Sequence, residues 1–176
     1  GYNCGIKAGR TKNDTALVYS EKLCNASGVF TRNIVKAESV KYTQQILKNG
    51  KAQAAIVNVG YANACTGEQG AQVAKKMAIA AANALNINPD DVIVCSTGII
   101  GQQVPVEKIE KNIMNLKNGL SKEGHKDASI GIMTTDTVLK EIAVSFTVGG
   151  KECKIGGIAK GSGMIHPNMA TMLVFI

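Results

Sequence analysis

The amino-acid sequence predicts a single domain of the α/β (or α+β) class, in which strands and helices share one core. Three observations carry this prediction. The chain has 176 residues and is 45% apolar, which is enough for one domain with a real core. Short apolar runs typical of strands alternate with segments whose apolar residues recur at helical spacing. No linker or low-complexity stretch divides the sequence.

The first third of the chain is predicted to contain three strands and one helix. Residues 15–20 and 28–35 have the β-branched and aromatic composition of strands, and residues 54–59 (AAIVNV) form a short apolar run typical of a buried strand. Between them, residues 38–49 are predicted to form a helix that stops at Gly50. The residues of its buried face are Val40, Thr43, Ile46 and Leu47.

The strand at residues 54–59 begins the first of two units that each consist of a strand, a glycine-containing loop and a helix. The loop reads "GYANACTGEQG", and a helix over residues 71–85 follows. Thr66 and Gln69 have the spacing of a capping box at its start. One face of this helix carries Ala74, Met77, Ala78, Ala81, Ala82 and Leu85.

The second unit begins with an apolar strand at residues 92–95 and continues into the loop "STGIIGQQVP". Pro105 suits the first position of the helix that follows, because proline lacks the N–H that a first turn leaves unpaired. The apolar residues at helical spacing are Val106, Ile109, Ile113, Leu116 and Leu120.

The last third of the chain is predicted to be rich in strands. Residues 129–133 form a strand that opens into "TTDT", and residues 140–148 alternate with a period of two. Gly149-Gly150 is a two-residue hairpin signal that leads into a strand at residues 151–159. The apolar run at residues 171–176 has strand character, but the sequence shows no partner for it.

Composition disfavours several classes of protein. The formal net charge is +7, but the lysines are scattered and aromatic residues make up only 4%, so nucleic-acid binding is a weak alternative. No apolar stretch approaches the ~20 residues that a membrane helix needs, so no membrane association is expected.

The five cysteines predict neither a disulfide framework nor a zinc site, since they are odd in number and lack a CxxC pair. We expect a reducing compartment, the cytoplasm, and small buried apolar roles for these side chains. Cys65 and Cys95 lie near loop motifs, so a functional role is a minor alternative for these two residues. His125 and His166 are too isolated to suggest a metal centre.

Three loops contain residues suited to catalysis or binding. Thr97 and Gly98 offer a hydroxyl and an unobstructed backbone N–H, a pair that suits a developing oxyanion, although Ser-Thr-Gly is also common as a plain turn. "TTDT", which includes Thr134, is by composition more often a turn or a helix cap. Lys160 is not a P-loop lysine because Gly161 follows it, but it is suited to meet a carboxylate; a surface lysine is the alternative.

Four motifs together resemble one known family. "NACTG" at residues 63–67, "STGIIG" at 96–101, "MTTDT" at 133–137 and "KGSGMIHPNMATML" at 160–173 are similar to the signatures of the glutamate N-acetyltransferase / ornithine acetyltransferase (ArgJ) family, in its order and roughly its spacing. The likeness spans nearly the whole chain. It implies the family's layered sheet-and-helix fold, similar to that of L-aminopeptidases, with an N-terminal-nucleophile mechanism.

The resemblance implies that the precursor cuts itself between Ala170 and Thr171. Thr171 would then be the nucleophile, and its new α-amino group, with a pKa near roughly 8, would be the adjacent base. Thr97 and Gly98 would form the oxyanion hole, and Thr134, Lys160 and Thr171 would contact the substrate.

The implied reaction is acetyl transfer from N2-acetyl-L-ornithine to L-glutamate in arginine biosynthesis, without a cofactor or a metal. Some family members also accept acetyl-CoA, which the sequence does not decide. The implied partner is the protein's own second (beta) chain, with two copies of each chain in the assembly. Residues 1–170 would be the alpha chain and residues 171–176 the start of the beta chain, so we expect the sequence to be an amino-terminal portion.

Two departures and two alternatives accompany the resemblance. Residues 59–63 (VGYAN) replace the family's usual Ser-Gly-Asn-Ala-Asn, and the sequence stops five residues after Thr171. One alternative function is an amide hydrolase of the same fold, similar to the aminopeptidases. The other is a basic binding module whose motifs are plain turns.

Overall fold

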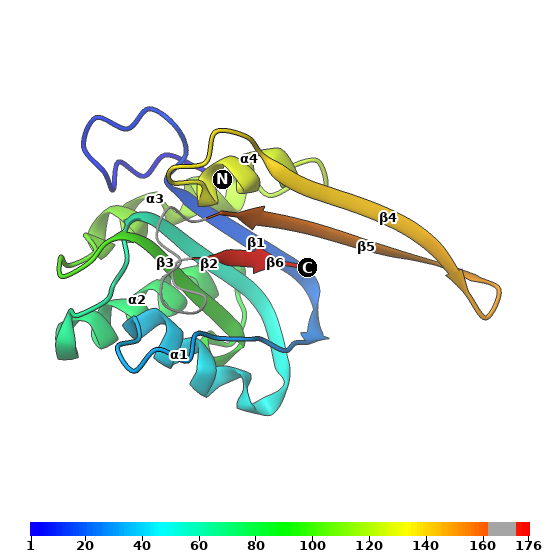
Figure 1. Cartoon of the computed structure of the whole chain (residues 1–176), viewed down its shortest axis with the longest axis horizontal. Helices are drawn as coiled ribbons and strands as arrows, with labels where there is room; N and C mark the ends of the chain where they lie inside the picture. Colours follow the sequence, from blue (N-terminus) through cyan, green and yellow to red (C-terminus); the bar gives the residue numbers. More distant parts are fainter. Residues whose placement is uncertain (162–171) are drawn as a thin grey trace.

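The computed structural model describes residues 1–161 and 172–176, and it places them in two sheets and four α-helices (Figure 1). The first sheet has the strand order β1-β2-β3 and the second the order β4-β5-β6. The elements in chain order are β1 (Thr15–Asn25), α1 (Glu38–Ile46), the 3-10 turn η1 (Leu47–Asn49), β2 (Lys51–Tyr61), α2 (Gly67–Leu85), η2 (Pro89–Asp91), β3 (Val92–Ile99), α3 (Val106–Asn118), α4 (His125–Ile132), β4 (Lys140–Val148), β5 (Lys151–Lys160) and β6 (Leu173–Phe175). The predicted mixture of strands and helices in one fold is confirmed. Within the described residues, no helix combines the length and the apolar character needed to cross a membrane.

The first sheet contains the predicted strand, loop and helix unit. β1 and β2 are antiparallel, whereas β2 and β3 are parallel and joined through α2, as a crossover helix requires. β2 is the central strand and is buried on both faces along most of its length. This position explains why its sequence is a continuous apolar run instead of an alternating one.

The main core lies between the first sheet and helices α2 and α3. Ile56 and Val94 project from the sheet toward Met77 of α2 and Ile109 of α3, and each of these four side chains is at most 1% exposed. The alanines of α2 belong to the same cluster and allow the helix to approach the sheet closely. The helical spacing predicted for residues 71–85 is therefore confirmed, and so is that from Val106 to Leu116, whereas Leu120 lies beyond the end of α3.

Helix α1 covers the edge strand β3 through a buried hydroxyl. Thr43 Oγ1 donates to the carbonyl of Val94 at 2.7 Å and accepts from the Val94 N–H at 3.1 Å. Both backbone groups lie on the edge of the sheet, where no further strand of the described chain pairs with them. The hydroxyl thus satisfies an edge that would otherwise be left without partners.

The other face of the first sheet packs against α4 and the second sheet. Ala16 of β1 and Val57 of β2 form a small buried cluster with Ala128 and Ile132 of α4, and Ile158 of β5 packs against it. β6 pairs with β5 in antiparallel register, so the structure supplies the partner that the sequence does not show for the apolar run after residue 171.

The hairpin of β4 and β5 projects from the rest of the molecule (Figure 1). Gly149 and Gly150 have φ values of 57° and 77°, which confirms the two-residue turn predicted there. The alternating residues of β4 form one face, but that face is open to solvent. Its exposed apolar residues are Ile142, Val144, Phe146 and Val148, with Ile155 of β5 beside them.

The prediction of a strand at residues 28–35 is wrong. These residues lie outside every strand of the structure, and Val29, Ile34 and Val35 are 83%, 95% and 61% exposed. β-Branched composition favours a strand only where a neighbouring edge is available to pair with it. Here β1 has already paired with β2 and ends at Asn25.

The prediction of a strand at residues 129–133 is also wrong, because most of this segment belongs to α4. Ala128 and Ile132 are four residues apart and point into the same buried cluster, as one helix face does. A short apolar run does not by itself distinguish a buried strand from a buried helix.

Two predictions about helix starts need correction. The capping box at α2 is absent: the Thr66 hydroxyl donates to Asn63 Oδ1 at 2.8 Å, and no side chain caps the helix. Asn63 has a φ of 51°, and its Nδ2 donates to the Gly70 carbonyl at 2.9 Å. The Asn63 side chain thus connects the loop to the first turn of α2. Pro105 immediately precedes α3 instead of occupying its first position.

Candidate active site

A cavity of about 1490 Å³ lies where the end of β3, the loop after α4 and the end of β5 meet. Its lining includes Thr97, Gly98, Thr134 and Lys160, the four described residues that the sequence singled out for chemistry. These residues come from three loops or strand ends that are far apart in the chain. The fold therefore brings them to one concave surface, as expected of loops positioned by a rigid scaffold.

Thr97 is fully buried at the end of β3, and its hydroxyl lacks a hydrogen-bond partner among the described residues. A buried hydroxyl without a partner is uncommon in folded proteins, because losing its hydrogen bonds with water costs about 1–3 kcal/mol. Such a group is available to donate to a bound oxygen atom. The neighbouring strand explains its burial, since Thr97 pairs with Val59 of β2.

Gly98 must be glycine for two independent reasons. Its φ is 140°, a conformation that residues with a side chain rarely adopt, and a Cβ atom there would lie 2.2 Å from the carbonyl carbon of Gly60. β2 and β3 approach each other closely at this point, and the pairing register shifts between Gly60 and Tyr61. The backbone at the cavity is therefore shaped by a glycine that no other residue can replace without movement.

Lys160 is a buried cation and not a surface lysine. It is the last residue of β5, it is 1% exposed, and its Nζ donates to the Gly161 carbonyl at 2.7 Å. Burial lowers the pKa of Lys160, and the nearby positive charge of Lys140 lowers it further, whereas the negative charge of Asp136 raises it. The expectation of a loop lysine is corrected: Lys160 lies on a paired strand, which fixes its position.

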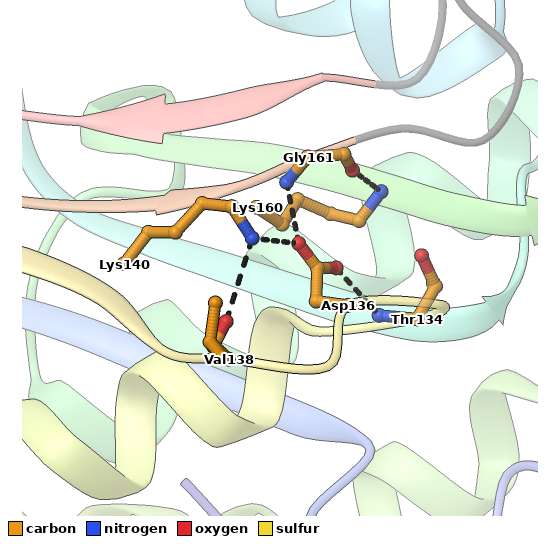
Figure 2. A network of polar contacts seen from close by, with 6 residues as sticks. All are labelled: Thr134, Asp136, Val138, Lys140, Lys160 and Gly161. Atoms are coloured by element: carbon orange, nitrogen blue, oxygen red, sulfur yellow. Dashed lines mark hydrogen bonds and ion pairs between the residues drawn. The ribbon is translucent and has the colours of Figure 1, made fainter.

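Sequence reasoning missed Asp136, which lies within "TTDT" and bonds to the backbone of the lining residue Thr134. The Asp136 side chain is 2% exposed and accepts from three donors (Figure 2). Oδ1 accepts from the Gly161 N–H at 2.7 Å and from Lys140 Nζ at 2.7 Å, and Oδ2 accepts from the Thr134 N–H at 3.3 Å. Burial by itself raises the pKa of Asp136, but these hydrogen bonds outweigh it and hold the pKa below its ordinary value.

Arg10 is a second residue that the sequence did not indicate. Its Nη2 donates to the Met133 carbonyl at 3.0 Å and to the Asn13 carbonyl at 2.8 Å. It thereby ties the N-terminal loop to the residue before Thr134. A lone arginine far from every motif gives no signal in a single sequence.

The cavity lining includes two cysteines, Cys24 and Cys95. Within the described part of the chain, no group of three or more His, Cys, Asp or Glu side chains could hold a metal ion. Burial raises the pKa of Cys95 to about 12, so its thiol stays protonated. The prediction of buried cysteines is wrong for Cys24 and Cys65, which are exposed.

Ala170 and Thr171, the predicted cleavage site and nucleophile, lie outside the described residues. Lys160 and Leu173 precede and follow this undescribed range, and they pair with each other on the adjacent strands β5 and β6. Their predicted roles stay predictions.

The fold and the cavity define a two-sheet α/β protein with a buried threonine, a positive-φ glycine and a buried lysine at one site. Comparison with known proteins then gives the family: the ArgJ family pattern matches residues 1–176, and this chain belongs to that family.

Similar proteins include the arginine biosynthesis bifunctional protein ArgJ of Caldanaerobacter subterraneus subsp. tengcongensis, which is 55% identical over 176 residues, and that of Thermotoga neapolitana, which is 52% identical over 178 residues. Both matches cover 100% of this chain, but 43% and 44% of the relatives. The chain thus spans less than half the length of these curated relatives.

Two solved structures have the same fold. The crystal structure of arginine biosynthesis bifunctional protein ArgJ from Bacillus halodurans has a TM-score of 0.90 and 42% identity, and covers 97% of this chain and 88% of that one. Ornithine acetyltransferase from Mycobacterium tuberculosis, complexed with ornithine, has a TM-score of 0.88 and 39% identity, with coverages of 97% and 90%. The layered fold implied by the sequence motifs is confirmed.

Proposed function

We propose that this chain is the amino-terminal part of an acetyltransferase that moves the acetyl group of N2-acetyl-L-ornithine to L-glutamate in arginine biosynthesis. Family membership supports this activity, as do relatives named arginine biosynthesis bifunctional protein and a structural neighbour named ornithine acetyltransferase. The observation that carries the proposal is the convergence of Thr97, Gly98, Thr134 and Lys160 on one cavity.

The chemistry requires a nucleophile, a base and a place for negative charge. In the proposal, Thr171 attacks the acetyl carbonyl of acetylornithine, and its own α-amino group takes the hydroxyl proton. The carbonyl oxygen becomes negative in the tetrahedral intermediate, where the Thr97 hydroxyl and the Gly98 N–H stabilise it. As the C–N bond breaks, the protonated α-amino group gives its proton to the departing ornithine and an acetyl-threonine ester remains. The amino group of glutamate then attacks this ester, and acetylglutamate forms as the ester C–O bond breaks and the Thr171 oxygen regains a proton. Lys160 and Thr134 hold polar groups of the substrates.

Self-cleavage between Ala170 and Thr171 is part of the proposal, because an amide nitrogen cannot act as the base. Residues 1–170 would then be an alpha chain, and a beta chain beginning at Thr171 would complete the enzyme as an assembly of two copies of each. The coverages support this division: the chain matches 43% of a full-length relative but 88% and 90% of the two crystallised chains. We place the enzyme in the cytoplasm, and we propose no resident cofactor or metal.

The test uses the full-length protein, meaning this chain together with the remaining length that its relatives have. Incubation with acetylornithine and glutamate should yield acetylglutamate and ornithine, measured by mass spectrometry. Intact-mass analysis should find two chains for the wild type and one for Thr171→Ala. Release of acetate without acetylglutamate would instead support the amide-hydrolase alternative, and a single uncleaved wild-type chain would contradict the proposed base. Acetyl-CoA is added in a separate reaction to test it as a second donor.

The basic binding module, in which the motifs are plain turns, has less support because Thr97 and Lys160 are buried on paired strands. A nucleic-acid shift assay over a salt series tests it, since phosphate contacts weaken steeply as salt rises.

A further inference from the structure

The carboxylate of Asp136 joins the two segments that carry Thr134 and Lys160. One of its oxygens accepts from the N–H of Thr134, and the other accepts from the N–H of Gly161, directly after Lys160. Figure 2 shows Lys140 approaching this carboxylate from one side, with the ends of the Thr134 and Lys160 side chains on the other.

We propose that Asp136 is a positioning residue for substrate binding: its carboxylate sets the spacing between Thr134 and Lys160. This inference rests on the proposed acetyl transfer, in which these two residues hold the substrates.

The hydrogen-bond pattern requires a carboxylate and not an amide. Asp136 receives three donors, namely two backbone N–H groups and the Lys140 ammonium, and donates to none of them. An asparagine of the same shape would have one acceptor oxygen and one NH₂ group, so its NH₂ would face an N–H or an ammonium. Asp136→Asn therefore breaks one side of the connection while it preserves the volume of the side chain.

The charge of Asp136 acts on Lys160 in the opposite direction to burial. Asp136 raises the pKa of Lys160, whereas burial and Lys140 lower it. Removing the charge of Asp136 through Asp136→Asn should therefore lower the pKa of Lys160. Removing the charge of Lys140 through Lys140→Met should raise the pKa of Lys160. Since a neutral Lys160 no longer attracts a carboxylate, the alkaline limb of the activity profile reports this pKa.

The experiment measures kcat/KM for acetylornithine between about pH 7 and pH 10.5. This range includes the ordinary pKa of an α-amino group, about 8, and that of a lysine, about 10.4. The full-length wild type, Asp136→Asn and Lys140→Met are compared, with Asp90→Asn as the control because Asp90 is an exposed carboxylate on η2. Intact mass verifies that each variant is cleaved, and thermal unfolding verifies that each is folded.

We expect Asp136→Asn to lower kcat/KM about 10²-fold, as a misplacement of about 1 Å does, mostly through KM. Its alkaline limb should move to lower pH, while that of Lys140→Met moves to higher pH and that of Asp90→Asn stays with the wild type. Opposite shifts are the signature of positioning and charge, because a merely structural role would lower folded yield and leave the shape of the profile unchanged.

Three other results would overturn the inference. Wild-type kinetics for Asp136→Asn, or shifts of the same sign in both variants, would show that Asp136 acts on structure alone. If Asp136→Asn does not fold, Asp136→Glu decides, because it keeps the charge but displaces the carboxylate from the Thr134 and Gly161 N–H groups: a raised KM supports the inference, and wild-type kinetics overturn it. A wild type that makes no acetylglutamate refutes the proposed function itself, a result distinct from an active wild type with an indifferent Asp136→Asn.

Discussion

The two sheets of this protein differ in the pattern of their strands and in what covers them. β2 in the first sheet has helices on one face and α4 with the second sheet on the other, and its residues from Ala54 to Gly60 are buried. β4 in the hairpin alternates with a cleaner period of two, yet all nine of its residues are exposed. The difference shows that periodicity predicts a strand, whereas burial depends on which elements pack against it.

The cavity lies where these two regions meet. Thr97 and Gly98 belong to the covered sheet, and Lys160 lies at the end of β5, where the hairpin returns to the core. A rigid backbone therefore holds the proposed oxyanion site, while the substrate-binding lysine depends on the second sheet and on Asp136. The predictions below test this contrast with matched substitutions in the two regions.

The largest expected effect comes from a pair of glycines. Gly98→Ala should destabilise the full-length protein by about 2–6 kcal/mol, as the sum of backbone strain and overpacking against Gly60. Gly156→Ala in β5 meets no atom within 4 Å and should stabilise by about 0.5 kcal/mol. Denaturant unfolding of both variants measures the difference. Equal effects of the two substitutions would refute the contrast.

A smaller effect is expected from a pair of isoleucines. Ile56→Ala removes a fully buried side chain of β2 and should cost about 2–5 kcal/mol, whereas Ile142 of β4 is 72% exposed and its replacement by alanine should cost less than about 0.5 kcal/mol. Unfolding midpoints of the full-length protein give both values. If Ile142→Ala costs as much as Ile56→Ala, the rest of the full-length protein covers the hairpin.

A pair of threonines tests the edge of the first sheet. Thr43→Val leaves the Val94 N–H and carbonyl without the buried hydroxyl and should cost about 1–3 kcal/mol. Thr147→Val on the exposed hairpin keeps the same change in shape and should lie within about 0.5 kcal/mol of the wild type. Hydrogen exchange of the Val94 amide should accelerate in Thr43→Val alone, and unchanged protection would show that the hydroxyl is not needed there.

The smallest effect concerns the ion pair that joins α4 to β4. His125 Nδ1 lies 3.0 Å from Glu141 Oε2, an arrangement that raises the pKa of His125 above 6.5 and lowers that of Glu141 below 4.5. The histidine contribution to stability is present below pH 6.5 and is lost as the pH rises through the raised pKa. The glutamate contribution is present above pH 4.5 and is lost as the pH falls through the lowered pKa.

The pair therefore stabilises the base of the hairpin between these limits. Glu141→Gln should lower the pKa of His125 toward 6.5 in an NMR titration, and its unfolding midpoint should fall below that of the wild type near about pH 5.5 and converge with it near about pH 9. An identical His125 titration in both proteins would exclude the pair in solution.

The sequence predicts correctly the elements whose apolar pattern is long or whose turn signal is strong. The helix over residues 71–85 was clear because its alanine-rich face repeats over several turns, and the Gly149-Gly150 turn was clear because both residues need positive φ. The prediction of a strand at residues 129–133 is wrong because five apolar and small residues fit both the period of a strand and that of a helix. The prediction of a strand at residues 28–35 is wrong because a strand needs a partner strand, and the local sequence does not show whether one is available.

The candidate site was predicted in part for the same reason. Thr97, Gly98, Thr134 and Lys160 lie in compact motifs that can be recognised locally, and the structure places them at one cavity. Asp136 was overlooked because its significance depends on a hydrogen bond to Gly161, 25 residues away. Arg10 contacts Met133 across 123 residues and was equally invisible.

By itself, the sequence determined the mixed α/β class, most of the helices, the hairpin and the four motifs that indicate the family. These features depend on local conformational preference and on the order of residues along one segment. Only the tertiary structure decided that Lys160 is buried, that β6 pairs with β5, that the apolar face of β4 is exposed and that Asp136 connects two parts of the cavity. Each of these depends on atoms brought together from distant segments, and burial, pairing and electrostatic coupling are properties of that proximity.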